Sequence, residues 1–139
     1  IEHTASRGWE MPDGTVLVQT LSLPLEGSKP GTWTRIETRL FTRQDRRWAG
    51  YSYRWNEAQT DATLVEARGT EVTLQLQPGA DAPGASRQTW RFPSRTECLG
   101  CHSRAVNFTL SLNDAQMNRD HTYPGGDAKT LRCTVVFDS

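Results

Sequence analysis

The chain has little cysteine, no net charge and no long apolar run. Only 3 of its 139 residues are cysteine, which is too few for a secreted scaffold stapled by disulfides. Lysine plus arginine equals aspartate plus glutamate at 16 each, and this balance argues against a nucleic-acid binder, which normally carries a basic excess. No apolar stretch reaches about 18 residues, so no membrane-spanning helix is expected.

The sequence also has no basic-then-apolar leader. Its first residue, Ile1, is the start expected of a mature protein or an excised module. The length fits one domain with a core of its own. Localisation therefore has to be inferred from the chemistry of the chain.

The first two thirds of the chain predict an antiparallel β scaffold. A polar break at 43–46 is typical of a hairpin turn, and the longest polar loop covers 78–86. Strands are expected where apolar and polar residues alternate or where β-branched and aromatic residues gather, at 15–23, 32–42, 47–55, 62–67, 71–77 and 87–92.

The remaining third predicts helices. Ser94 followed three positions later by Glu97 forms a capping box, which predicts a short helix from about Arg95 to Val106. The same signature predicts a second short helix from Asp114, and one last strand is expected from Thr130. We therefore expect a mainly β (α+β) fold, a sandwich or barrel with a small C-terminal helical cap.

The stretch "ECLGCHS" places Cys98 and Cys101 three positions apart and His102 directly after them. A structural zinc site needs four ligands, and adjacent Cys101 and His102 could hardly bind one tetrahedral ion without strain. A thioredoxin-like dithiol would follow a strand of a βαβ unit, and two unreactive buried cysteines would give the histidine no role. The other residues that could bind zinc are His3, His121 and Cys133.

A c-type haem attachment site uses all three residues of the motif. Thioethers from Cys98 and Cys101 would fix one covalent haem c to a helical turn, and His102 would supply an axial nitrogen to the iron. This interpretation is favoured over the others. It leaves Cys133 without an assigned role.

The second axial ligand has several candidates. Met117 is favoured, because a methionine thioether raises the reduction potential and suits electron transfer. The same side chain also fits a hydrophobic staple of the second predicted helix. The alternatives are Met11, just before the first strand, and His121; His3 belongs to a fraying end.

Aromatic and basic residues near the motif are expected to contact the haem. Trp90 and Phe92 are predicted to pack against it. Arg95 is predicted to pair with a propionate, although solvation at the surface would explain it equally. The flanking arginines are Arg91 and Arg104, and the remaining tryptophans, assigned to core and haem packing, are Trp9, Trp33, Trp48 and Trp55.

Several segments taken together resemble a single-haem cytochrome c domain of environmental bacteria. Such domains commonly end larger exported polypeptides, some with carbohydrate-active or sugar-dehydrogenase-like parts. The resemblance implies haem attachment through Cys98, Cys101 and His102, electron transfer, and a β wall closed by a haem-bearing helical cap. The segments are "GTVLVQTLSL", "RIETRLFTR", "GYSYRWNEAQTDATLV", "WRFPSRTECLGCHS" and "QMNRDHTY".

We therefore expect one cytochrome c domain over 1–139, with a β scaffold at 1–92, a haem-binding segment at 93–126 and a tail at 127–139. Its predicted function is single-electron transfer without catalysis, as a monomeric module serving a redox partner protein or a fused redox domain. Covalent haem places it in the periplasm or outside the cell. Two alternatives remain: a haem enzyme or gas or peroxide sensor with an open sixth site, and a carbohydrate-binding β module.

Overall fold

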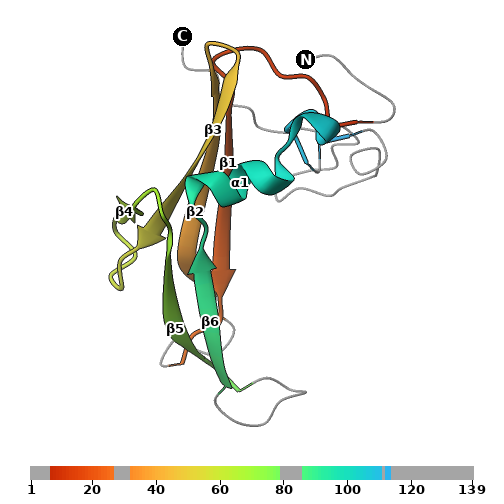
Figure 1. Ribbon diagram of the computed structural model, residues 1–139. Coiled ribbons are helices and arrows are strands. Elements are labelled where there is room, and N and C mark those ends of the chain that lie inside the picture. Colours follow the sequence, from red (N-terminus) through yellow and green to blue (C-terminus); the bar gives the residue numbers. More distant parts are fainter. Residues whose placement is uncertain (1–6, 27–31, 79–85, 111, 114–139) are drawn as a thin grey trace, which may run out of the picture. The chain divides into compact units, whose positions relative to one another are not determined.

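The computed structural model describes residues 7–26, 32–78, 86–110 and 112–113 (Figure 1). Six strands lie close to the ranges that alternation predicts. None of the helices in these residues is long and apolar enough to cross a bilayer. The elements are β1 Val16–Leu23, β2 Thr34–Gln44, β3 Arg47–Trp55, β4 Ala62–Leu64, β5 Thr70–Leu76, β6 Ser86–Phe92, the helix α1 Arg95–Cys101 and the 3-10 helix η1 Arg104–Val106.

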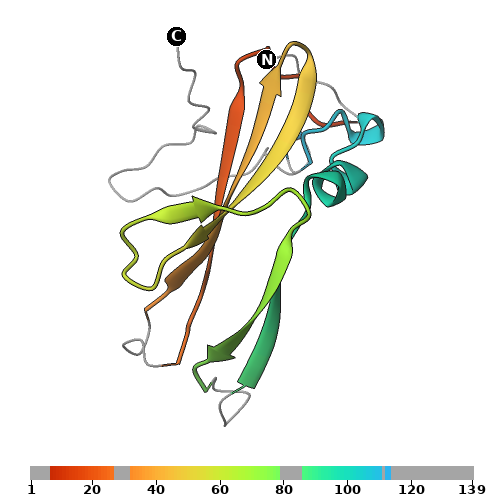
Figure 2. The same ribbon diagram turned by 60° about the vertical axis from the view of Figure 1, so that its left-hand side comes forward.

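The strands form two sheets. One has four strands in the order β1-β2-β3-β4, and the other is the hairpin β5-β6. The pairs β3-β4 and β5-β6 are antiparallel. The turned view shows β5 and β6 running side by side in the hairpin (Figure 2). The predicted mainly β fold with antiparallel sheets is confirmed; the described strands are consistent with a sandwich and do not close into a barrel.

The turn between β2 and β3 lies within the polar break predicted from the sequence. Asp45 and Arg46 have φ values of 48° and 60°. Two successive left-handed residues are typical of the two-residue hairpin turn whose twist matches that of the strands. The backbone N–H of Arg46 donates to the Asp13 carboxylate at 2.9 Å, which ties the turn to the segment before β1.

The chain divides into two compact units. The first draws on 1–17, 42–49 and 99–139, and the second on 18–41 and 50–98. Strands β1, β2 and β3 and helix α1 each contribute residues to both.

In the first unit, the segment before β1 supplies much of the core. Trp9, Met11 and Trp48 are buried. The Arg43 guanidinium donates to the carbonyl of Met11, and the fully buried Thr15 hydroxyl donates to the carbonyl of Pro12 at 2.7 Å. Burying each large apolar side chain contributes about 1.5–3 kcal/mol.

The core of the second unit combines apolar side chains with one carboxylate. Ile36, Phe41 and Phe92 are buried, and Glu37 on β2 is completely buried as well. Its carboxylate accepts hydrogen bonds from Arg39 on the same strand and from residues of β3 and β6. A buried charge is tolerated only when it is paired and hydrogen-bonded, and this network therefore links the two sheets.

The junction between β6 and α1 packs tightly on the turn before β5. Gly69 has a φ of +74°, and a Cβ at this position would lie 2.5 Å from the carbonyl oxygen of Phe92. The N–H of Arg95 donates to the carbonyl of Ala67 at 3.0 Å. This close approach fixes where α1 begins.

Candidate functional site

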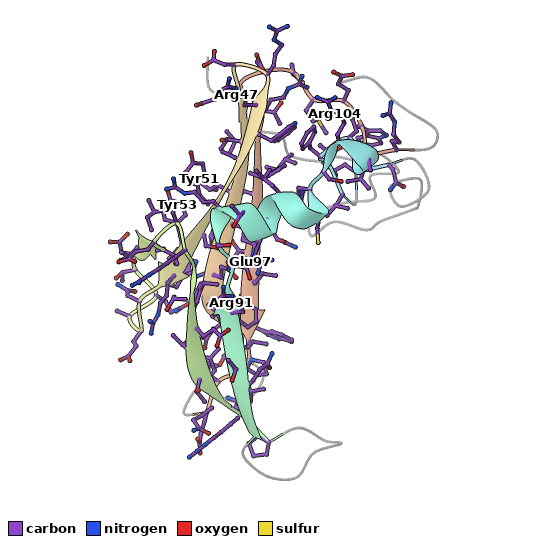
Figure 3. The ribbon with its side chains drawn as sticks, in the orientation of Figure 1. Arg47, Tyr51, Tyr53, Arg91, Glu97 and Arg104 are labelled. Carbon is purple, nitrogen blue, oxygen red and sulfur yellow. The ribbon has the colours of Figure 1, made fainter. Side chains whose placement is uncertain are left out.

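The capping box predicted at the start of α1 is present. The N–H of Glu97 donates to Oγ of Ser94 at 3.2 Å, and the N–H of Ser94 donates to Oε2 of Glu97 at 2.6 Å. Arg91 of β6 points at the same carboxylate, with Nη2 3.0 Å from Oε2 (Figure 3). The hydrogen bond from the Ser94 backbone, followed by those from the Ser94 hydroxyl and Arg91, lowers the pKa of Glu97 to about 2.

The helix is shorter than the sequence predicts. It ends at Cys101 rather than near Val106, because Ser103 adopts an extended backbone with φ −104° and ψ 170°. The N–H of Ser103 bonds to the Cys101 carbonyl two residues back, at 2.9 Å, and the chain resumes as the 3-10 turn η1. The motif histidine therefore lies just beyond the helix.

Cys98 lies in the second unit, where its side chain packs on β3. A Cβ built on Gly50 would lie 2.8 Å from Cβ and 2.9 Å from Sγ of Cys98, and 3.5 Å from the Phe41 ring. The thiol is half-buried. Burial raises its pKa, and the nearby charge of Arg39 opposes that rise. Only a glycine at position 50 leaves room for this thiol.

Cys101 lies at the last position of α1, in the first unit, and is exposed. Both cysteines are free thiols. Residues three positions apart on a helix are neighbours on its surface, with Cβ atoms about 5–6 Å apart. The two thiols therefore occupy one turn of α1, as haem attachment requires.

A hydrogen bond orients the His102 imidazole. Nδ1 lies 2.7 Å from the carbonyl oxygen of Phe108. A carbonyl oxygen can only accept, so Nδ1 must carry the proton and the lone pair of the neutral ring lies on Nε2. A bond of this kind fixes the tautomer and the direction of histidines that bind metals.

The loop after η1 places the Phe108 carbonyl. Asn107 and Phe108 have φ values of 54° and 63°, in the left-handed region that is unusual for a residue as bulky as phenylalanine. The N–H of Phe108 donates to the Ser103 carbonyl at 2.9 Å and that of Asn107 to the Arg104 carbonyl at 3.1 Å. These bonds hold a backbone conformation that otherwise costs about 1–3 kcal/mol per residue.

The same loop is clamped to the segment before β1, within the first unit. The Asn107 amide donates to the Gly8 carbonyl at 3.0 Å, and the buried Thr109 hydroxyl donates to the Trp9 carbonyl at 2.7 Å. The rings of Phe108 and Trp48 are stacked with centroids 6.4 Å apart. The carbonyl that faces His102 is thus held by contacts outside the loop itself.

Three further residues predicted to bind the cofactor lie in the second unit. Nε1 of Trp90 donates to Oε2 of Glu37 at 3.1 Å, and Phe92 is completely buried. The Arg95 guanidinium lies 4.9 Å from the centroid of the Tyr51 ring. Trp90 and Arg95 thus have partners in their unit and Phe92 belongs to its core, and a role toward haem stays a prediction for all three.

Of the predicted sixth ligands, the structure describes Met11, which is buried in the first unit. Met117, His121 and His3 lie outside the described residues, as do Cys133, the second predicted helix and the predicted last strand. The choice of sixth ligand stays a prediction.

The donor set fits a c-type haem. The motif supplies two thiols on one helical turn and an imidazole whose Nε2 bears the lone pair. Within the described part of the chain, no group of three or more His, Cys, Asp or Glu side chains could hold a metal ion. That result does not bear on haem, because the porphyrin supplies the equatorial nitrogens and the protein supplies the axial ligands alone.

An open pocket of about 260 Å³ lies in the second unit, at the end of β3 and the turn after β4. Arg54, Leu64 and Arg68 are among its lining residues, and none of the predicted cofactor-binding residues lines it.

Sequence reasoning missed three participants in these arrangements: Gly50, the Phe108 carbonyl and buried Glu37. Gly50 carried a signal, since a glycine inside a strand often marks the close approach of another group. Phe108 carried none, because its contribution is a backbone atom. Glu37 resembled a solvated position on an alternating strand until its partners on β3 and β6 were known.

Comparisons with known proteins found no relatives. No family model matches the chain, and neither a curated protein nor a solved structure matches it.

Proposed function

We propose that this chain is an electron-transfer module that carries one c-type haem, bound covalently through Cys98 and Cys101 with His102 as an axial ligand. The observation that carries the proposal is the 2.7 Å hydrogen bond from Nδ1 of His102 to the Phe108 carbonyl. This bond gives a defined tautomer to the imidazole that directly follows the two thiols of one helical turn.

The chain's own residues would have three tasks. The two thiols would anchor the cofactor to α1, and Nε2 of His102 would bind the iron. The Phe108 carbonyl would keep the imidazole from rotating and would increase its basicity through the Nδ1 hydrogen bond. When bound, haem supplies reversible one-electron chemistry whose potential depends on axial ligands and burial.

The proposal extends to partners and location. An electron-transfer module needs a donor and an acceptor, so we propose a redox partner protein or a fused redox domain, including one that acts on carbohydrate. The zero formal charge of the chain favours a local docking patch or a covalent tether over long-range electrostatic steering. Covalent haem attachment favours the periplasm or the extracellular space.

The test is an optical spectrum of the chain expressed with haem-maturation machinery, ferric and then reduced. We expect covalent haem that survives denaturation, low-spin ferrous bands and no reaction with carbon monoxide. His102→Ala should lose the low-spin spectrum, whereas His121→Ala should keep it if methionine is the sixth ligand. Loss of the far-red ferric band in Met117→Ala or Met11→Ala would identify the sulfur.

The other outcomes separate the alternatives. A high-spin haem that binds carbon monoxide at once would indicate an enzyme or sensor with an open sixth site. A chain that takes up no covalent haem would contradict the proposal. Binding to polysaccharide that survives replacement of both Cys98 and Cys101 would favour the carbohydrate-binding alternative.

A further inference from the structure

The two thiols of the motif differ before any cofactor is present. Cys101 is exposed at the end of α1, whereas Cys98 is half-buried against β3. The Cα of Gly50 is so close that a Cβ there would lie 2.9 Å from Sγ of Cys98. The glycine between the two cysteines, Gly100, has no described residue within 4 Å of the position of a Cβ, its chain neighbours and the helix backbone aside. The close contact with Gly50 therefore constrains Cys98, whereas Cys101 is exposed.

We propose that the two thioethers form in a fixed order, Cys101 first and Cys98 second, and that Gly50 sets this order by seating Cys98 on β3. This inference rests on the proposed function. In each step the S–H group adds across a haem vinyl group: Sγ bonds to the inner vinyl carbon, the π bond breaks, and the thiol proton ends on the terminal carbon. No oxidant or reductant is consumed.

The order follows from access and reactivity. An exposed thiol can meet a vinyl group while the cofactor is still mobile, whereas Cys98 must leave its contact with Gly50 or wait until the cofactor is held beside it. The thiolate is the reactive form of cysteine, and burial disfavours it; the raised pKa of Cys98 acts in the same direction. Attachment at Cys101 would then make the reaction at Cys98 intramolecular.

The first test needs no haem. The apo chain is exposed to short pulses of iodoacetamide, and modification at each cysteine is measured by peptide mass spectrometry, with the denatured chain as reference. We expect Cys101 to react several-fold faster than Cys98 in the folded chain and the difference to vanish on denaturation. Equal rates, or a faster Cys98, would overturn the proposal.

Two glycine variants provide a matched pair. Gly50→Ala should displace Cys98 and bring its alkylation rate toward that of Cys101, whereas Gly100→Ala should leave the ratio unchanged. An unchanged ratio in a folded Gly50→Ala chain would contradict the role of this glycine. If that variant does not fold, the ratio in the wild-type chain still decides whether the thiols differ.

Single-cysteine variants test the order itself. Co-expressed with haem-maturation machinery, Cys98→Ala should retain haem through one thioether, and Cys101→Ala should lose most of its covalent haem. Equal yields would overturn the order while leaving the proposed function standing. A wild-type chain that shows unequal alkylation but takes up no covalent haem would instead overturn the proposed function, and the order of attachment with it.

Discussion

Replacing Glu37 by glutamine should strongly destabilise the second unit. The side chain is completely buried, and its oxygens accept from Nε and Nη2 of Arg39 at 2.9 Å each, from the Ser52 hydroxyl, and from Nε1 of Trp90 at 3.1 Å. Glutamine keeps the shape but has one acceptor oxygen. Its NH₂ group would replace the other oxygen, and the donors that face this oxygen would lose their acceptor.

The loss in the free energy of unfolding caused by Glu37→Gln follows from these contacts. A hydrogen bond to a charged group contributes about 1.5–3 kcal/mol, and Arg39, whose side chain is 39% exposed, can recover part of its loss by turning to water. We therefore expect a loss of about 3 kcal/mol in the free energy of unfolding. With a urea slope of about 2 kcal/mol per molar, the unfolding midpoint followed by circular dichroism should fall by about 1.5 M.

The matched control is the same substitution in an exposed ion pair. Arg68 lies 2.8 Å from Glu66, and these side chains are 83% and 73% exposed. Glu66→Gln should change the free energy of unfolding by less than about 0.5 kcal/mol, because exposed ion pairs contribute little. If both substitutions shift the urea midpoint by the same small amount, the buried network does not hold the two sheets together.

Two further predictions concern Glu97 and the glycines at positive φ. Because the pKa of folded Glu97 is about 2, below the ordinary 4.5, its carboxylate stabilises the fold above pH 4.5 and this contribution is lost as the pH falls toward about 2. Glu97→Gln should flatten the dependence of urea stability on pH in that window; an unchanged slope would contradict the pKa. Gly69→Ala should cost about 2–4 kcal/mol, from the left-handed backbone and the clash with Phe92. Gly14 has φ +84° and open space around it, so Gly14→Ala should cost about 1 kcal/mol. Equal shifts of the urea midpoint in the two variants would rule out the clash at position 69.

The elements that the sequence predicted well depend on neighbours along the chain. Alternation with a period of two and polar turn residues located the six strands of the described residues, and β3 has the predicted bounds. The capping box at the start of α1 is equally local, since Ser94 and Glu97 hydrogen-bond to each other and lie three residues apart in the sequence. Such signals need no knowledge of the rest of the fold.

The elements predicted less well depend on distant contacts. The strand expected at 62–67 ends at Leu64, and the chain turns at Ala67 and Arg68, where the N–H of Gly69 donates to the Glu66 carbonyl at 2.8 Å. The predicted end of α1, near Val106, is wrong because the helical pattern of the sequence continues past Cys101, where the helix ends. Which glycine in a strand lies beneath a thiol cannot be known until the helix is placed on that strand.

The backbone at Phe108 links the fold to the proposed function. A glycine would adopt a φ of 63° without strain, so conformational freedom does not explain phenylalanine there. Its ring stacks on Trp48, and its carbonyl accepts from His102. One residue therefore anchors the loop through its side chain and orients the imidazole through its backbone. Strain held in place by surrounding contacts is typical of functional sites, and here the contacts that hold it, to Gly8 and Trp9, lie almost a hundred residues earlier in the chain. Under the proposed function, this distant support serves to hold the carbonyl that orients His102.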